Sequence, residues 1–90
     1  MLLITEVAIR FDTEEDMDLF LKNCEKENIT WLDGRYATEF NPYMECEEEI
    51  CITIRVDMGG YIYLVYDSVD YYKAIGRKIL NFEKIKGRII

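Results

Sequence analysis

Residues 50–66 constrain the fold more than any other part of the chain. Apolar and polar side chains alternate along the first half of this stretch, a period of two that is typical of a strand with one buried face. A turn at 58–60 then leads into a second β-prone run, so the stretch predicts an antiparallel hairpin. A two-residue Gly-Gly loop would place Val56 opposite Tyr63, whereas a three-residue loop would place Val56 opposite Ile62. We predict the three-residue loop, because it gives one aliphatic face and one mixed face.

The mixed face of this hairpin carries Arg55, Tyr61 and Tyr63. Exposed tyrosines beside an arginine are frequent anchors of binding surfaces. Tyrosines paired across strands with β-branched residues also stabilise a sheet by about 0.2–1 kcal/mol a pair, without any partner. Both interpretations stay open, and an open aromatic face also suits a homodimer.

A strand and a long helix are predicted before the hairpin. Residues 3–11 have strand character, and Thr13 is placed to cap a helix that runs to about Glu27. One apolar stripe at helical spacing marks the buried side of this helix. The stripe comprises Met17, Phe20, Leu21 and Cys24. Asn28 is predicted to end the helix in a left-handed conformation.

The rest of the chain predicts shorter elements. Residues 33–49 have no sustained period, which indicates either a short strand near 36–40 or a functional loop. A short second helix is predicted within 67–76, and a closing edge strand at 80–83. Together these elements predict a single α+β domain over 1–90. It has a small antiparallel sheet of three to five strands, with one main helix packed on its aliphatic face.

The composition argues against catalysis. The chain has 90 residues and no histidine, which excludes Cys/His zinc sites and nucleophiles activated by histidine. The acidic residues lack the spacing of a calcium-binding loop, and a domain of this size offers little room for a catalytic cleft. We therefore predict a protein that is not an enzyme and needs no metal or cofactor.

Two further features bear on the cellular setting. The three cysteines are Cys24, Cys46 and Cys51, an odd number without C-x-x-C spacing, which favours a reducing cytoplasm. Residues 1–11 lack a basic start and are interrupted by Arg10, so they predict neither a signal peptide nor a membrane span.

Charge is distributed unevenly along the chain. The formal net charge is −7, and residues 1–50 hold 14 acidic and 4 basic side chains. The first acidic run opens the predicted helix and comprises Asp12, Glu14, Glu15, Asp16 and Asp18. The second precedes the hairpin and comprises Glu45, Glu47, Glu48 and Glu49. The runs can complement a helix dipole and form a solvated loop that protects the adjacent strand from aggregation, or they can imitate a row of phosphates. This balance argues against direct nucleic-acid binding and permits a basic protein partner.

A second candidate site lies around the only tryptophan. Trp31, Arg35 and Tyr36 flank a glycine turn at Gly34, and together with Arg55, Tyr61 and Tyr63 they could stack on a base and hold a phosphate. The alternative is that the tryptophan closes the end of the core, since Gly34 lacks the companions of a phosphate-binding glycine loop.

Several short motifs resemble those of small acidic proteins encoded by bacteriophages and prophages. They are the helix FLKNCEKENI, then TWLDGR, ATEFNP, a hairpin and the tail DSVDYYKAIGRKILNF, and the resemblance covers residues 6–83. The resemblance implies no particular functional residue. It implies a host-cell setting, in which such proteins often antagonise host defence in stoichiometric amounts.

Two mechanisms fit that setting. As in many anti-CRISPR proteins, the acidic runs would cover the basic nucleic-acid channel of a host defence protein. Alternatively, an oligomer would sequester a small nucleotide signal at the aromatic and arginine residues. A phage accessory protein without an inhibitory role is a third reading.

Overall fold

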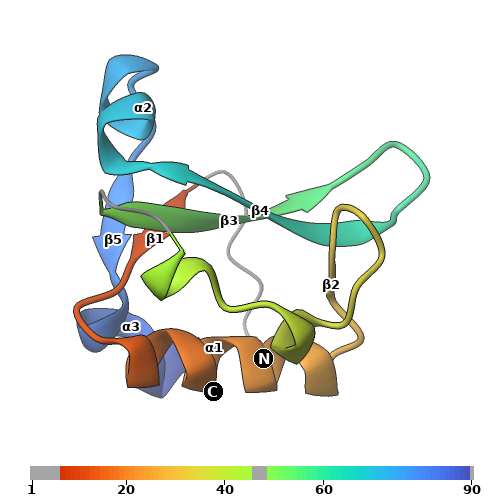
Figure 1. Cartoon of the computed structure of the whole chain (residues 1–90). Helices are drawn as coiled ribbons and strands as arrows, with labels where there is room; N and C mark the ends of the chain where they lie inside the picture. Colours follow the sequence, from red (N-terminus) through yellow and green to blue (C-terminus); the bar gives the residue numbers. More distant parts are fainter. Residues whose placement is uncertain (1–6, 46–48, 90) are drawn as a thin grey trace.

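The sheet has five strands in the order β2-β4-β3-β1-β5, and α1 packs against one of its faces (Figure 1). The computed structural model describes residues 7–45 and 49–89. Its elements, in chain order, are β1 (Ala8–Arg10), α1 (Glu14–Lys26), β2 (Thr30–Trp31), the 3₁₀ turns η1 (Ala37–Glu39) and η2 (Pro42–Met44), β3 (Ile50–Val56), β4 (Ile62–Ser68), α2 (Val69–Ala74), β5 (Ile79–Asn81) and α3 (Phe82–Ile89). This arrangement confirms the α+β class.

The sheet is mixed, so the predicted purely antiparallel arrangement is wrong. β1–β3 and β3–β4 are antiparallel, whereas β1–β5 and β2–β4 are parallel. The two parallel partners are the edge strands β2 and β5, which are only two and three residues long. Side-chain periodicity carries no information on strand direction, and such short strands give almost no periodicity at all.

The central hairpin has the predicted register. Val56 pairs with Ile62, and the glycine at the end of the three-residue loop, Gly60, is left-handed with φ of 85°. The Asp57 backbone closes the loop through a 2.9 Å hydrogen bond from its N–H to the Tyr61 carbonyl. The Asp57 carboxylate also accepts hydrogen bonds from two backbone amides of the turn. These contacts fix which side chains of the hairpin face each way.

Both predicted ends of α1 are confirmed. The Thr13 hydroxyl accepts a 3.1 Å hydrogen bond from the Asp16 backbone amide, which caps the first turn. At the other end Asn28 has a φ of 60°, and the Ile29 amide returns to the Cys24 carbonyl at 2.9 Å. The cap thus redirects the chain from the helix into β2.

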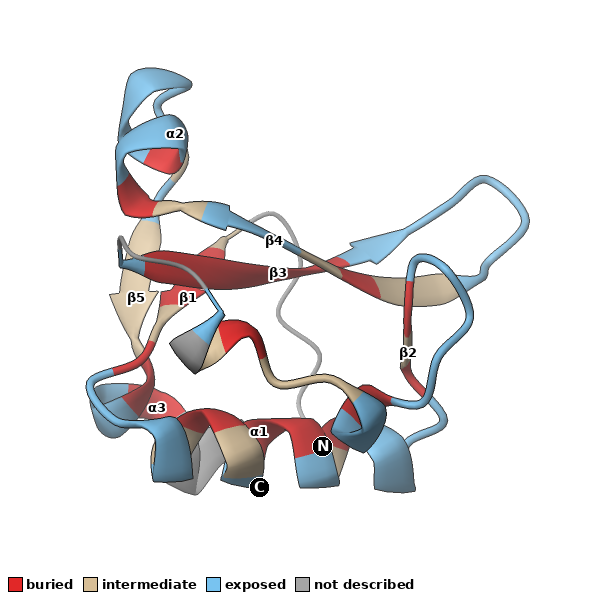
Figure 2. Ribbon diagram, viewed as in Figure 1, coloured by how far each residue is buried: buried red, intermediate tan, exposed pale blue. Residues whose placement is uncertain are grey.

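The main core lies between α1 and the aliphatic face of the sheet (Figure 2). Ile52, Ile54 and Leu64 face it from the hairpin. An aromatic group at one end joins three elements, because the rings of Phe11 and Phe82 lie 5.2 Å apart and both contact the ring of Phe20. The closing edge strand was predicted at residues 80–83. In the structure this strand is β5 and ends at Asn81, and Phe82 is already the first residue of α3.

The segment between β2 and β3 is neither a strand nor an open loop in its described part. It contains η1 and η2, which pack against α1 and cover one side of the core (Figure 1). Proline begins η2, and the Asn41 side chain caps it by accepting a hydrogen bond from the Tyr43 amide. The predicted short strand near 36–40 is therefore wrong, because short 3₁₀ turns leave no periodic sequence signal that would distinguish them.

A second, smaller apolar cluster lies on the opposite face, where α2 packs on the sheet. It includes Ala8, Cys51, Val69 and Tyr72. Burial raises the pKa of the Cys51 thiol to about 11, and in the main core burial raises the pKa of Cys24 to about 12. Both thiols are therefore protonated at neutral pH and act as small apolar side chains. Cys46 lies outside the described residues.

Candidate functional surfaces

The fold brings η2, which precedes the second acidic run, against α1. The Tyr43 hydroxyl of η2 donates a 2.9 Å hydrogen bond to the Asp12 carbonyl, so this side chain joins η2 to the start of the helix. We call the exposed carboxylates of this region the acidic end. It comprises Asp12, Glu14, Glu15 and Glu45. Asp12 is held in place by the Asn81 side chain, which donates to its carboxylate at 3.0 Å.

The carboxylates of the acidic end differ in whether they have partners. Among the described residues, Glu14, Glu15 and Glu45 have neither a hydrogen-bond partner nor an ion-pair partner for their side chains. Two other predicted acids form ion pairs with basic side chains. Asp18 pairs with Lys22 at 2.9 Å, and Glu49 pairs with Arg10 at 2.8 Å. Glu47 and Glu48 lie outside the described residues.

The mixed face of the hairpin carries a stacked tyrosine pair. The rings of Tyr61 and Tyr63 have centroids 5.7 Å apart at an interplanar angle of 20°. Arg55 lies directly opposite Tyr63 in the strand register and is exposed, as predicted. The Tyr61 hydroxyl forms a hydrogen bond with the Thr30 hydroxyl of β2, which fixes the position of its ring. α2 covers the other half of this face, and the tyrosine pair lies on the half that no described helix covers, which we call the uncovered half (Figure 1).

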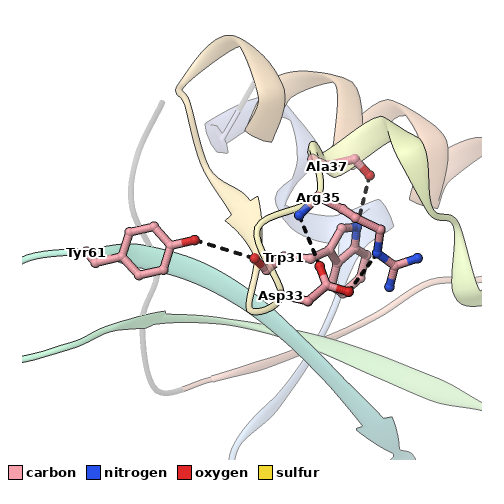
Figure 3. Close-up of polar contacts among 5 residues, drawn as sticks. All are labelled: Trp31, Asp33, Arg35, Ala37 and Tyr61. Atoms are coloured by element: carbon pink, nitrogen blue, oxygen red, sulfur yellow. Dashed lines mark hydrogen bonds and ion pairs between the residues drawn. The ribbon is translucent and has the colours of Figure 1, made fainter.

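Trp31 closes the end of the core. It is only 3% exposed, and its indole Nε1–H donates a 3.1 Å hydrogen bond to the Ala37 carbonyl (Figure 3). Phe40 and Tyr66 pack edge-on against its ring at centroid distances of 5.5 and 5.8 Å. A ring in this position cannot offer its face to a base without opening the core.

Arg35 and Tyr36 lie at the edge of the same cluster. The Arg35 guanidinium sits 4.4 Å above the ring of Phe40 and pairs with Asp33 through its Nε–H at 2.7 Å. The Arg35 backbone amide, and then its side chain, hold the pKa of the Asp33 carboxyl below its usual range. The Tyr36 side chain is 62% exposed.

The six residues that were predicted to stack on a base and hold a phosphate therefore do not form one site. The Trp31 ring and the Arg35 guanidinium pack on the core side, whereas Arg55, Tyr61 and Tyr63 lie on the opposite face of the sheet. Only the Trp31 carbonyl approaches the Tyr61 hydroxyl, at 3.5 Å (Figure 3).

A hollow at the edge of β4 was not predicted. It has a volume of about 280 Å³, and we call it the edge groove. Its lining residues are Trp31, Leu32, Asp33, Arg35, Leu64, Val65 and Tyr66. The groove exists because β2 ends after two residues at the Gly34 turn. In the described ranges, 7–45 and 49–89, no group of three or more side chains is arranged to bind a metal.

The described residues form a small α+β domain with three distinct surface features, namely the acidic end, the tyrosine pair of the hairpin and the edge groove. Comparisons with protein-family models, curated proteins and solved structures gave no match for this chain. Within the part of the chain that the structure describes, no helix is long and apolar enough to cross a bilayer.

Proposed function

We propose that this protein acts by stoichiometric binding, as a counter-defence inhibitor. Its acidic end covers the basic nucleic-acid-binding surface of a host defence protein. The observation that carries this proposal is that Glu14 and Glu15 at the start of α1, and Glu45 at the end of the neighbouring η2, are exposed and without counter-ions among the described residues. Carboxylates placed in this way can occupy arginine and lysine positions that otherwise hold phosphates.

Stability of the fold explains only part of this acidic end. Glu14 and Glu15 lie in the first turn of α1, where each acid gains about 0.3–1 kcal/mol from the helix dipole. Glu45 is the C-cap of η2, and a carboxylate gains nothing from a dipole at that end. Helix-dipole stabilisation therefore does not explain the exposed Glu45 carboxylate, which favours a role in binding.

The test is a charge reversal with a matched control. The double variant Glu15→Lys, Glu45→Lys changes one acid in a first helical turn and one in a 3₁₀ segment. The control variant Asp70→Lys, Glu39→Lys makes the same kind of change on α2 and η1. Each raises the formal net charge from −7 to −3, because every reversal adds two charges. We expect the first variant to lose inhibition by at least about tenfold and the control to keep it, since local complementarity contributes more than net charge.

The measurement uses a panel of purified bacterial defence nucleases, including RNA-guided effectors, and target-DNA binding as the readout. One member of the panel should lose DNA binding when the protein is added in equal amount, and added salt should weaken this inhibition. Equal inhibition by both variants, or no inhibition across the panel, would contradict the proposal and leave an accessory role.

The stacked tyrosines favour sequestration of a nucleotide signal as a second candidate function. Tyr63 and Arg55 adjoin on the uncovered face, so a base could stack there while the guanidinium holds a phosphate. The net charge of −7 opposes this function, because it repels phosphates at long range.

The prediction for sequestration concerns thermal stability. A cyclic or ADP-ribose-like nucleotide at 100 times its Kd should stabilise the fold by about 2.7 kcal/mol and raise the Tm accordingly. The shift should disappear in Tyr63→Ala and in Arg55→Gln, whereas Tyr36→Ala should keep it. A panel of nucleotides without any Tm shift would exclude this function.

A further inference from the structure

The outer edge of β4 is only partly occupied. β2 pairs with β4 at Tyr63 and Leu64, and the Leu32 amide adds a 3.1 Å hydrogen bond to the Leu64 carbonyl. The chain then turns back, since the Gly34 amide donates to the Trp31 carbonyl at 2.9 Å. β4 itself continues to Ser68. In the described part of the chain, no strand pairs with this outer edge of β4 beyond Leu64.

The direction of the backbone groups follows from this pairing. In a strand, alternate residues point their N–H and C=O groups to opposite sides. Leu64 points its carbonyl towards β2, so Tyr66 points its N–H and C=O to the same outer edge. Ser68 follows in this row, but its amide already donates to the Asp67 carboxylate at 2.7 Å. The Tyr66 backbone therefore offers one donor and one acceptor, without a strand partner among the described residues.

These groups lie at the edge groove. The Tyr66 side chain packs against Trp31 and Phe40, which gives the groove an aromatic wall. Leu32, exposed at 62%, lines the side formed by the turn after β2. The volume of about 280 Å³ suits one or two side chains and does not suit a large ligand.

Arg35 adds a charge to the same groove. Its Nε–H is paired with Asp33 and its guanidinium carbon lies over the Phe40 ring, so two contacts position the guanidinium. Among the described residues, its terminal nitrogens have no carboxylate partner. A fixed guanidinium with free N–H groups is a binding site for a carboxylate.

We propose that the edge groove binds an extended peptide segment of a partner protein, which adds a short strand to β4 and places a carboxylate on Arg35. The N–H and C=O of Tyr66 point to the same edge of β4, which is the arrangement that an added peptide strand pairs with. Apolar side chains next to the carboxylate would fill the groove beside Leu32 and Tyr66. The edge groove is separate from the acidic end, so peptide binding here does not depend on the proposed inhibition.

The test is a titration of the ¹⁵N-labelled full chain, followed by NMR. The probes are mixtures of five-residue peptides, acetylated and amidated, with glutamate at the centre and Val, Ile, Thr and Tyr at the other positions. We expect saturable shifts at the Tyr66 amide and the Arg35 Nε–H. Replacing the central glutamate by glutamine should weaken binding about tenfold. A third set, with a central glycine and a free C-terminal carboxylate, distinguishes a terminal carboxylate from a side-chain carboxylate.

Two protein variants and one modified peptide distinguish specific binding at this groove from nonspecific binding. Arg35→Gln should weaken binding of the glutamate peptides about tenfold, whereas the matched Arg55→Gln on the opposite face should leave it unchanged. Methylation of the peptide backbone nitrogens should abolish binding, because it removes the strand hydrogen bonds. Equal binding of glutamate and glutamine peptides, shifts unaffected by Arg35→Gln, or no shift with any peptide would each overturn the proposal.

Discussion

Replacing Phe20 by alanine is expected to lower the free energy of unfolding by about 3–5 kcal/mol. The Phe20 side chain is 1% exposed and contacts the rings of Phe11 and Phe82 at centroid distances of 5.3 and 5.9 Å. Its loss would leave a cavity where α1, α3 and the residue after β1 meet. Domains of this size have a total stability of about 5–15 kcal/mol, so the variant would lose a large share of it.

Urea denaturation followed by circular dichroism would measure this effect. Leu19→Ala is the matched control, because Leu19 is the next residue on the same helix but is 37% exposed. It should change the free energy of unfolding by less than about 1 kcal/mol. Similar losses in both variants would contradict the packing of α1 described above.

The second large effect is expected at Trp31. Trp31→Ala should cost about 3–5 kcal/mol, because it removes a buried ring and leaves a cavity beside Phe40 and Tyr66. Trp31→Phe keeps most of the ring but loses the Nε1–H that bonds to the Ala37 carbonyl. That change should cost less, about 1–3 kcal/mol.

The same urea measurement applies, and Tyr36→Ala provides the exposed control, with an expected change of less than about 0.5 kcal/mol. A stable Trp31→Ala variant that had lost nucleotide binding would instead identify the tryptophan as a ligand-binding residue. This pair of outcomes separates the two readings of Trp31 that the sequence left open.

Elements with strong local signals were predictable from the sequence. The hairpin register followed from the loop glycines and the alternation around Val56, and the ends of α1 followed from Thr13 and Asn28. Strand direction was not predictable, because β2 and β5 are too short to carry a pattern. The helix that begins at Phe82 was missed since its first residues alternate like a strand.

The candidate surfaces were predictable only where they lie within one element. Arg55, Tyr61 and Tyr63 share a face because the hairpin register alone decides it. The packing of η2, which ends at Glu45, against α1 depends on tertiary contacts such as the hydrogen bond from Tyr43 to Asp12. The edge groove depends on where β2 stops, which is decided by how the turn after Trp31 folds back.

The pairing of β1 with β5 has a consequence for biosynthesis. Ala8 lies beside Ile79, so β1 cannot pair with β5 until residues 79–81 have been translated. Until residues 79–85 have left the ribosome, Phe11 and Phe20 lack the ring that completes their cluster. The hairpin can form early, because its contacts are local, but β5 and α3 close the sheet and core last. We therefore expect the Phe11 and Phe20 rings to stay partly exposed in the nascent chain until α3 can fold onto them.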